Sequence, residues 1–147
     1  MINEKELFDI LNKTDSNFTV KEGVVNGLNV TLVIPTMNTV WNENNLELRS
    51  VMLDSRSVKE FLANPSKDSL PTIVSHGFPK FFNHFEEAKL KQCNISFSDE
   101  ELLKACFVPK IDGYCLLVDL INGKLNARTR GSLNAMEKFP NTAEELS

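Results

Sequence analysis

The sequence has no long apolar stretch, and this absence argues against a membrane-spanning helix. Its longest apolar run lies around Val30 to Pro35, far short of the about 20 residues that a membrane-spanning helix needs. The first residues, Met1 to Glu6, do not follow the basic-then-apolar plan of a signal peptide. We therefore expect a cytoplasmic protein with no membrane partner.

Cysteine and histidine are also scarce. Cys93, Cys106 and Cys115 are an odd number at spacings of 13 and 9 residues, which match neither a disulfide framework nor paired zinc ligands. We expect these three thiols to be buried. His76 and His84 have no third ligand at metal spacing, so the sequence predicts no dedicated metal site. No order of Ser, His and Asp indicates a hydrolase.

The bulk composition is ordinary, but the charge is unevenly spread. A length of 147 residues, with 41% hydrophobic and 24% charged residues, predicts one globular domain spanning 1–147. The net charge is −4, yet residues 101–131 hold five bases and three acids. Such a segment can hold a single nucleotide or one strand end, although a solvated strand face is the alternative. We expect the acidic tail at 133–147 to be solvated and flexible.

Turn dipeptides predict an α+β domain dominated by antiparallel sheets with short helices. Asn26-Gly27 and Asn122-Gly123 suit the positive φ angles of tight hairpin turns. The first hairpin joins strands at 18–25 and 28–34, and the second joins strands at 114–120 and 124–130. Two more strands are expected at 46–54 and 105–109.

Polar residues spaced three apart predict where short helices begin. These pairs are Asn3 with Glu6, Ser57 with Glu60, and Ser98 with Glu101. Residues 64–69 have the composition of a loop. The aromatic segment 78–83 is interpreted as a core anchor, because neighbouring phenylalanines usually pack inside proteins.

One segment points to a chemistry. Lys110-Ile111-Asp112-Gly113 places a lysine before a tight turn, and Arg128 and Arg130 follow on the returning strand. A lysine amine is a nucleophile only when burial or neighbouring cations lower its pKa, and both arginines are expected to do so and to hold phosphate oxygens. Asp112 is expected to fix the lysine or the nucleotide, and Gly113 to allow close backbone approach.

Four segments in order resemble the phage-type RNA ligase 1 family of ATP-dependent RNA ligases, within the covalent nucleotidyltransferase superfamily. They are Glu47-Leu48-Arg49-Ser50-Val51-Met52-Leu53-Asp54, Pro79-Lys80-Phe81-Phe82-Asn83, Lys110-Ile111-Asp112-Gly113 and Thr129-Arg130-Gly131-Ser132. The resemblance covers roughly residues 46–132, which match the N-terminal part of the family's adenylyltransferase domain. Its most specific element is the Lys-Phe-Phe-Asn sequence.

The resemblance implies a reaction and its cofactors, ATP and Mg²⁺. In the family, the lysine matching Lys110 attacks the α-phosphate of ATP and becomes a lysyl-AMP, and the AMP then passes to an RNA 5′-phosphate for end joining. Arg49 and Lys80 match residues of the nucleotide and phosphate site, and Phe82 is expected beside the nucleotide. Two positions depart from the family: Arg130 stands where it has lysine, and Ser50 stands where it has glycine.

The family's later motifs, including the metal-binding glutamate, have no counterpart in this sequence. Three hypotheses follow. The chain is an RNA ligase-like fragment that needs a second polypeptide, a noncatalytic protein that binds a nucleotide or an RNA end, or a structural module with a chance motif. A truncated nucleotidyltransferase domain also predicts exposed apolar surface, and hence self-association or a partner polypeptide.

Overall fold

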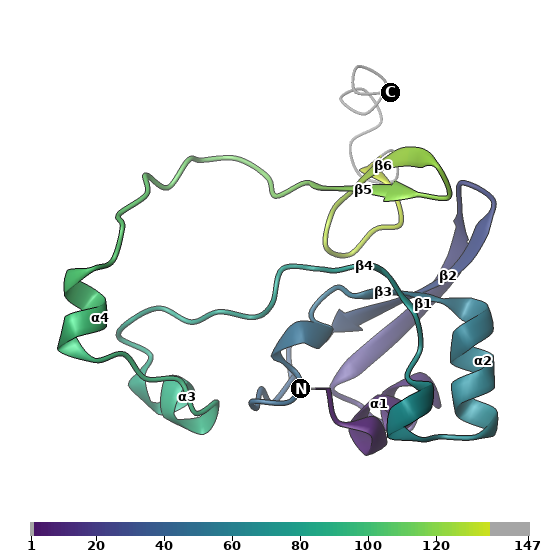
Figure 1. The fold of residues 1–147 in the computed structure, drawn as a ribbon, viewed down its shortest axis with the longest axis horizontal. Coiled ribbons are helices and arrows are strands. Elements are labelled where there is room, and N and C mark those ends of the chain that lie inside the picture. The colour runs from purple at the N-terminus through teal and green to yellow at the C-terminus, as the bar shows by residue number, and fades with distance from the viewer. Residues whose placement is uncertain (1, 136–147) are drawn as a thin grey trace.

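The computed structural model describes residues 2–135, and it has three layers (Figure 1). A four-stranded antiparallel sheet of order β1-β2-β3-β4 forms the middle layer. Helices cover one face, and a two-stranded hairpin, β5-β6, lies over the other. The strands are β1 Phe18–Val25, β2 Leu28–Pro35, β3 Met52–Asp54, β4 Ile73–Ser75, β5 Leu117–Ile121 and β6 Lys124–Arg128. The expected α+β class with antiparallel sheets and short helices is confirmed.

The helices are short. The covering pair is α1 (Glu4–Leu11) and α2 (Ser55–Ala63), and α3 (Glu87–Gln92) and α4 (Asp99–Leu103) lie on a long excursion between β4 and β5. Single 3₁₀ turns occupy Leu46–Leu48 and Lys67–Ser69. No helix within residues 2–135 has both the length and the apolarity to cross a membrane.

Strand β2 lies at the centre of two cores. Val33 packs with the helices, whereas Val30 and Leu32 face the hairpin and pack with Ile121 and Leu133. A strand that is buried on both faces requires consecutive apolar residues rather than alternation. Gly23 on β1 makes room for this second core, because a Cβ there would lie 2.2 Å from Leu133 Cδ1.

Both predicted hairpin turns are confirmed. Asn26 and Gly27 have φ angles of 50° and 80°, and Asn122 and Gly123 have φ angles of 52° and 79°. The two turns also bind each other, because Asn26 Nδ2 donates to the Ile121 carbonyl at 3.1 Å and Asn122 Nδ2 donates to the Asn26 carbonyl at 2.8 Å. This clasp fixes the β5-β6 hairpin against the end of the first hairpin.

Several boundaries differ from the predictions. Strand β1 and the helix starts after Asn3 and Ser98 are confirmed, and Ser98 forms a full capping box with Glu101. Strand β5 begins three residues later than predicted, and β6 ends two residues earlier. The cap expected at Ser57 is wrong: α2 already begins at Ser55, and Ser57 Oγ donates to the Asp54 carbonyl. The loop expected at 64–69 contains one of the 3₁₀ turns.

Two strand predictions are wrong in larger ways. Residues 105–109 are exposed and form no strand, because the excursion that carries them has no strand beside it to pair with. The strand expected at 46–54 is divided: residues 46–48 form a 3₁₀ turn, Ser50 has a φ of 68°, and only Met52–Asp54 pairs in the sheet. A left-handed residue interrupts the extended backbone that a strand needs.

The excursion, residues 76–116, extends away from the sheets (Figure 1). It exposes much apolar surface. Phe78 and Phe81 are 53% and 67% exposed and Phe82 is only partly buried, so the interpretation of residues 78–83 as a core anchor is wrong. The prediction of three buried thiols holds only for Cys93. Cys106 and Cys115 are exposed, because they lie in the exposed part of the excursion, before the chain reaches the core at Leu117.

Candidate functional site

A pocket of about 490 Å³ lies where the two sheets meet the end of the excursion. It gathers four segments that are far apart in the sequence: the end of β2, the residues before β3, the residues before β5 and the turn after β6. Its lining residues are Ile34, Pro35, Arg49, Ser50, Gly113, Tyr114, Cys115, Thr129, Arg130 and Gly131. Its charged side chains are two arginines, and none of its lining residues is acidic.

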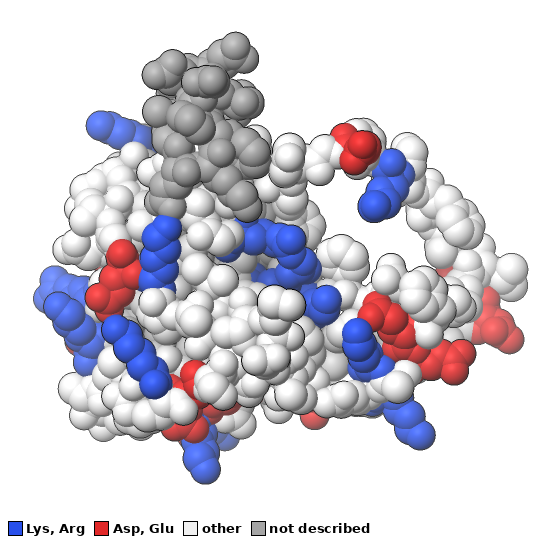
Figure 2. Space-filling model, turned by 180° about the vertical axis from the view of Figure 1, so that it is seen from behind, with Lys and Arg blue, Asp and Glu red and all other residues white. Residues whose placement is uncertain are grey.

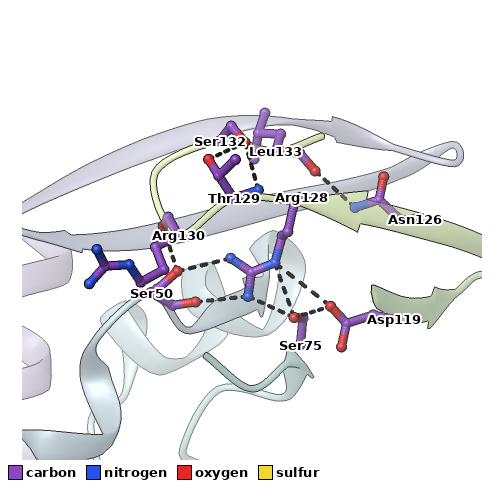
Figure 3. Close-up of polar contacts among 9 residues, drawn as sticks. All are labelled: Ser50, Ser75, Asp119, Asn126, Arg128, Thr129, Arg130, Ser132 and Leu133. Carbon is purple, nitrogen blue, oxygen red and sulfur yellow. Dashed lines mark hydrogen bonds and ion pairs between the residues drawn. The ribbon is translucent and has the colours of Figure 1, made fainter. Parts of the chain in front are cut away.

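The two lining arginines come from segments far apart in the sequence. Arg49 is half-buried, and its guanidinium carbon lies 5.5 Å from the ring centroid of Phe81, a distance typical of a cation–π contact. Arg130 is exposed, and its guanidinium points away from the buried network behind it (Figure 3). On the face shown in Figure 2, Lys and Arg side chains gather near the middle.

Arg130 lies in a turn, residues 129–132, that is held by the hydroxyl groups of its first and last residues. The Thr129 amide donates to Ser132 Oγ at 3.0 Å, and the two hydroxyl groups share a hydrogen bond of 2.7 Å. Both residues are buried, so water does not compete with these bonds. The Thr-x-x-Ser spacing is a local signal that allows such a turn, and it holds the backbone at Arg130 and Gly131 in place.

Ser50 joins the two sides of the pocket. It is 0% exposed, and its φ of 68° lies in the left-handed region, where glycine is ordinarily preferred. Its Oγ donates to the carbonyl of Arg130, while it accepts a hydrogen bond from Arg128 Nη1 at 3.0 Å. The position therefore adopts a conformation that glycine ordinarily supplies, and the hydroxyl adds bonds that glycine lacks.

Arg128 is the cation behind the pocket wall, and it is 0% exposed (Figure 3). Its Nη2 donates to the Ser50 carbonyl at 2.8 Å and to Ser75 Oγ at 2.7 Å, and its Nε lies 3.7 Å from Asp119 Oδ2. Ser75 Oγ in turn donates to the same carboxylate. Burial lowers the pKa of Arg128 and Asp119 opposes this shift, so the guanidinium stays charged at neutral pH.

Glycine permits a close backbone contact beneath the site. A Cβ on Gly77 would lie 2.2 Å from the carbonyl oxygen of Arg49 and 2.8 Å from that of Ser50. The segment after β4 therefore rests directly on the backbone that carries the first arginine. The amide of Lys80 also donates to the Leu46 carbonyl at 2.9 Å, so the beginning of the excursion is held to the 3₁₀ turn that precedes β3.

The structure brings three of the predicted site residues together, because Arg49, Gly113 and Arg130 all line the pocket. Lys110 and Asp112 are exposed on the excursion and do not line it.

The remaining predicted residues do not line the pocket. Arg128 lies behind the wall, so its donors serve the protein rather than an open phosphate site. Lys80 and Phe82 contact each other, with Nζ 5.2 Å from the ring centroid.

Sequence reasoning missed the residues that hold the site in place. Ser75 and Asp119 gave no local signal, because they meet Arg128 only after the sheets pack. The Thr-x-x-Ser spacing was the one signal available for Thr129 and Ser132. Tyr114 and Cys115 line the pocket because they follow Gly113, which was identified.

The donor groups at the pocket fit an anion better than a metal ion. Arginine forks match phosphate oxygens, so Arg49 and Arg130 suit the phosphates of a nucleotide. Magnesium prefers carboxylate and water oxygens, and no lining residue carries a carboxylate. Within residues 2–135, no group of three His, Cys, Asp or Glu side chains is placed to hold a metal ion. Glu137, Glu144 and Glu145 of the predicted acidic tail lie outside the described residues.

Comparisons of this chain with models of protein families, with curated proteins and with solved structures found no match.

The outer face of the β5-β6 hairpin is apolar and exposed. Val118, Leu120 and Leu125 are 63%, 70% and 75% exposed, and Leu120 pairs with Leu125 across the hairpin. Self-association or a partner polypeptide stays a prediction, and light scattering at high protein concentration tests it. A monomer under those conditions would contradict self-association.

Proposed function

We propose that this chain binds the phosphate of a nucleotide or of an RNA end in the pocket between Arg49 and Arg130. The observation that supports it is a concave site with two cations and no lining carboxylate. Its volume of about 490 Å³ falls within the range of small-molecule sites. Tyr114 at the rim supplies an aromatic surface on which a base can stack.

The backbone around the arginines favours binding because it is already ordered. Ser50, fixed by Arg128, adjoins Arg49 and bonds the Arg130 carbonyl. The backbones that carry both cations therefore need little rearrangement when an anion arrives, and pre-organised groups bind with a smaller entropic cost. Charge-assisted hydrogen bonds from a guanidinium to phosphate are among the stronger ones in proteins.

Calorimetric titration with AMP and with ATP tests this proposal. We expect Arg49→Gln and Arg130→Gln each to weaken binding by roughly 10- to 100-fold, the equivalent of one lost charge-assisted hydrogen bond. Arg56→Gln is the matched control, because Arg56 is exposed on α2 and does not line this pocket. Equal affinities for all three variants, or no binding by the unchanged protein, would refute the proposal.

The cysteines give an independent test that needs no substitution. Cys115 lines the pocket and Cys106 does not, and both are exposed. We expect bound nucleotide to slow the alkylation of Cys115 by iodoacetamide and to leave Cys106 unchanged. Equal protection of both, or of neither, would place the ligand elsewhere.

A second candidate function is adenylyl transfer by Lys110 as a step in RNA end joining. It is favoured by one observation: Gly113, three residues after Lys110, lines the pocket. In that reaction the deprotonated Lys110 amine attacks the α-phosphorus of ATP. A P–N bond forms, the nitrogen releases a proton, and the bond to pyrophosphate breaks. The resemblance implies that a second polypeptide would supply the carboxylates that hold Mg²⁺, which the lining lacks.

Intact-mass spectrometry after incubation with ATP and Mg²⁺ separates the two functions. Adenylyl transfer predicts a gain of one AMP that is lost in Lys110→Ala. The gain should persist in Lys104→Ala, an exposed lysine on the same excursion. Nucleotide binding without any adduct would instead favour the noncatalytic binder.

A further inference from the structure

We infer that the pocket recognises a 5′-phosphomonoester nucleotide, free or at a strand end, and that it does so without a metal ion. This inference rests on the proposed binding function and narrows its ligand class. It follows from the charges that face the pocket, from the carboxylates near it and from the support behind the two arginines.

The charges that face the pocket match one phosphomonoester. Arg49 and Arg130 are the charged lining residues, and a phosphomonoester carries about two negative charges at neutral pH. ATP adds further negative charge, which proteins usually balance with a magnesium ion held by carboxylates and the phosphates. The lining offers neither further cations nor a carboxylate for that purpose.

Within residues 2–135, none of the carboxylates near the pocket residues in sequence lines the pocket: Glu47 and Asp112 are exposed outside the lining, and Asp119 is engaged by Ser75 and Arg128. Asp119 Oδ2 accepts a hydrogen bond from Ser75 Oγ and lies 3.7 Å from Arg128 Nε. This arrangement also balances the charge of the buried Arg128 with that of the partly exposed Asp119, so the two lining arginines supply the net positive charge at the pocket.

The hydrogen-bond network behind the pocket wall holds the two lining arginines in place without a metal ion. Arg128 binds the hydroxyl and carbonyl of Ser50, and the same hydroxyl binds the Arg130 carbonyl. The backbones at both lining arginines are thereby fixed to a single buried group. Electrostatic groups that are held in place before a ligand arrives need no reorganisation when it binds.

Titrations of AMP and ATP, each in EDTA and in excess Mg²⁺, test this inference. We expect AMP to bind in EDTA with an affinity that Mg²⁺ changes less than about twofold, and Mg²⁺ to weaken ATP binding because it competes with the arginines for phosphate oxygens. Binding of AMP only with Mg²⁺, or a tenfold tightening of ATP by Mg²⁺, would overturn the inference and leave the proposed function intact. Absence of nucleotide binding in both buffers would overturn both.

A further experiment distinguishes a free nucleotide from the 5′ end of an RNA strand. A short single-stranded RNA with a 5′-phosphate is compared with the same RNA without it and with AMP. Tighter binding of the phosphorylated strand than of AMP identifies a strand end, and weaker binding identifies a free nucleotide.

The variant Asp112→Asn tests the role of the nearest free carboxylate. It should leave the AMP affinity unchanged in both buffers. An effect of Mg²⁺ that disappears in this variant would show that Asp112 holds a metal ion, against the inference.

Discussion

Replacing Ser50 by glycine and by alanine tests whether this serine is a strained residue held by its hydroxyl. Both changes remove the hydroxyl, and so leave Arg128 Nη1 without the acceptor that it has at 3.0 Å. A lost hydrogen bond to a buried charged group costs about 1.5–3 kcal/mol. Both changes also remove the donor to the Arg130 carbonyl. Arg130 is an exposed residue, so water can replace the lost Ser50 hydroxyl there.

The two variants differ in the backbone. Alanine keeps the steric cost of the φ of 68°, which is about 1–2 kcal/mol for a residue with a Cβ. Glycine removes this steric cost, but it makes the unfolded chain more flexible and so lowers the unfolding free energy by about 0.5–1 kcal/mol. We therefore expect Ser50→Ala to lose about 2–3 kcal/mol of unfolding free energy and Ser50→Gly about 0.5–1 kcal/mol less than that.

Urea denaturation followed by the fluorescence of Trp41 measures both values. Trp41 is the single tryptophan, and it packs edge-on against Phe18 at 5.7 Å in the helix-side core. Lys59, exposed in the middle of α2, is the control position. There the order should reverse, with alanine more stable than glycine by about 1 kcal/mol. If alanine is also the more stable residue at position 50, the reasoning about the left-handed backbone is wrong.

Two further predictions concern packing and burial. Gly77→Ala should lower the melting temperature by several degrees, because the added methyl would overlap two backbone carbonyl oxygens. Gly131→Ala is the control: its methyl extends into open space and should leave the melting temperature unchanged. Equal shifts in the two variants would contradict the close contact at Gly77. Burial raises the pKa of the Cys93 thiol, so the folded state keeps this proton at a pH where the unfolded chain releases it, and stability falls as the pH rises above the ordinary thiol value. Mass-resolved alkylation should label Cys106 and Cys115 in the folded protein and Cys93 only after urea is added, and early labelling of Cys93 would refute its burial.

Local signals account for the parts of the fold that the sequence predicted. The Asn-Gly pairs at 26–27 and 122–123 determine their own backbone angles, and the hairpins around them followed. Ser98 capped its helix because its partner Glu101 lies one turn away. Such features depend on residues within a few positions of each other, so they are visible before the chain folds.

The features that were missed depend on residues far apart. Residues 105–109 have the composition of a strand, but a strand also needs a partner, and none is beside them. The buried position of Arg128 is determined by Ser75, at the end of β4 in the other sheet, and by Ser50, just before β3; both lie more than fifty residues away. For the site, the sequence indicated the two lining arginines and Gly113, but not the network that holds the arginines in place.

The excursion between β4 and β5 has a consequence for how this chain can change length. Both of its ends are fixed: near its beginning the Lys80 amide binds the 3₁₀ turn that precedes β3, and the clasp between the two Asn-Gly turns holds the hairpin that follows it. The entropic cost of closing a flexible loop grows only with the logarithm of its length, by about 0.6 kcal/mol for each doubling. Residues between the two anchors can therefore be inserted, deleted or exchanged for another sequence with little effect on the folding of the sheets, which makes the excursion a natural place for grafting a foreign peptide.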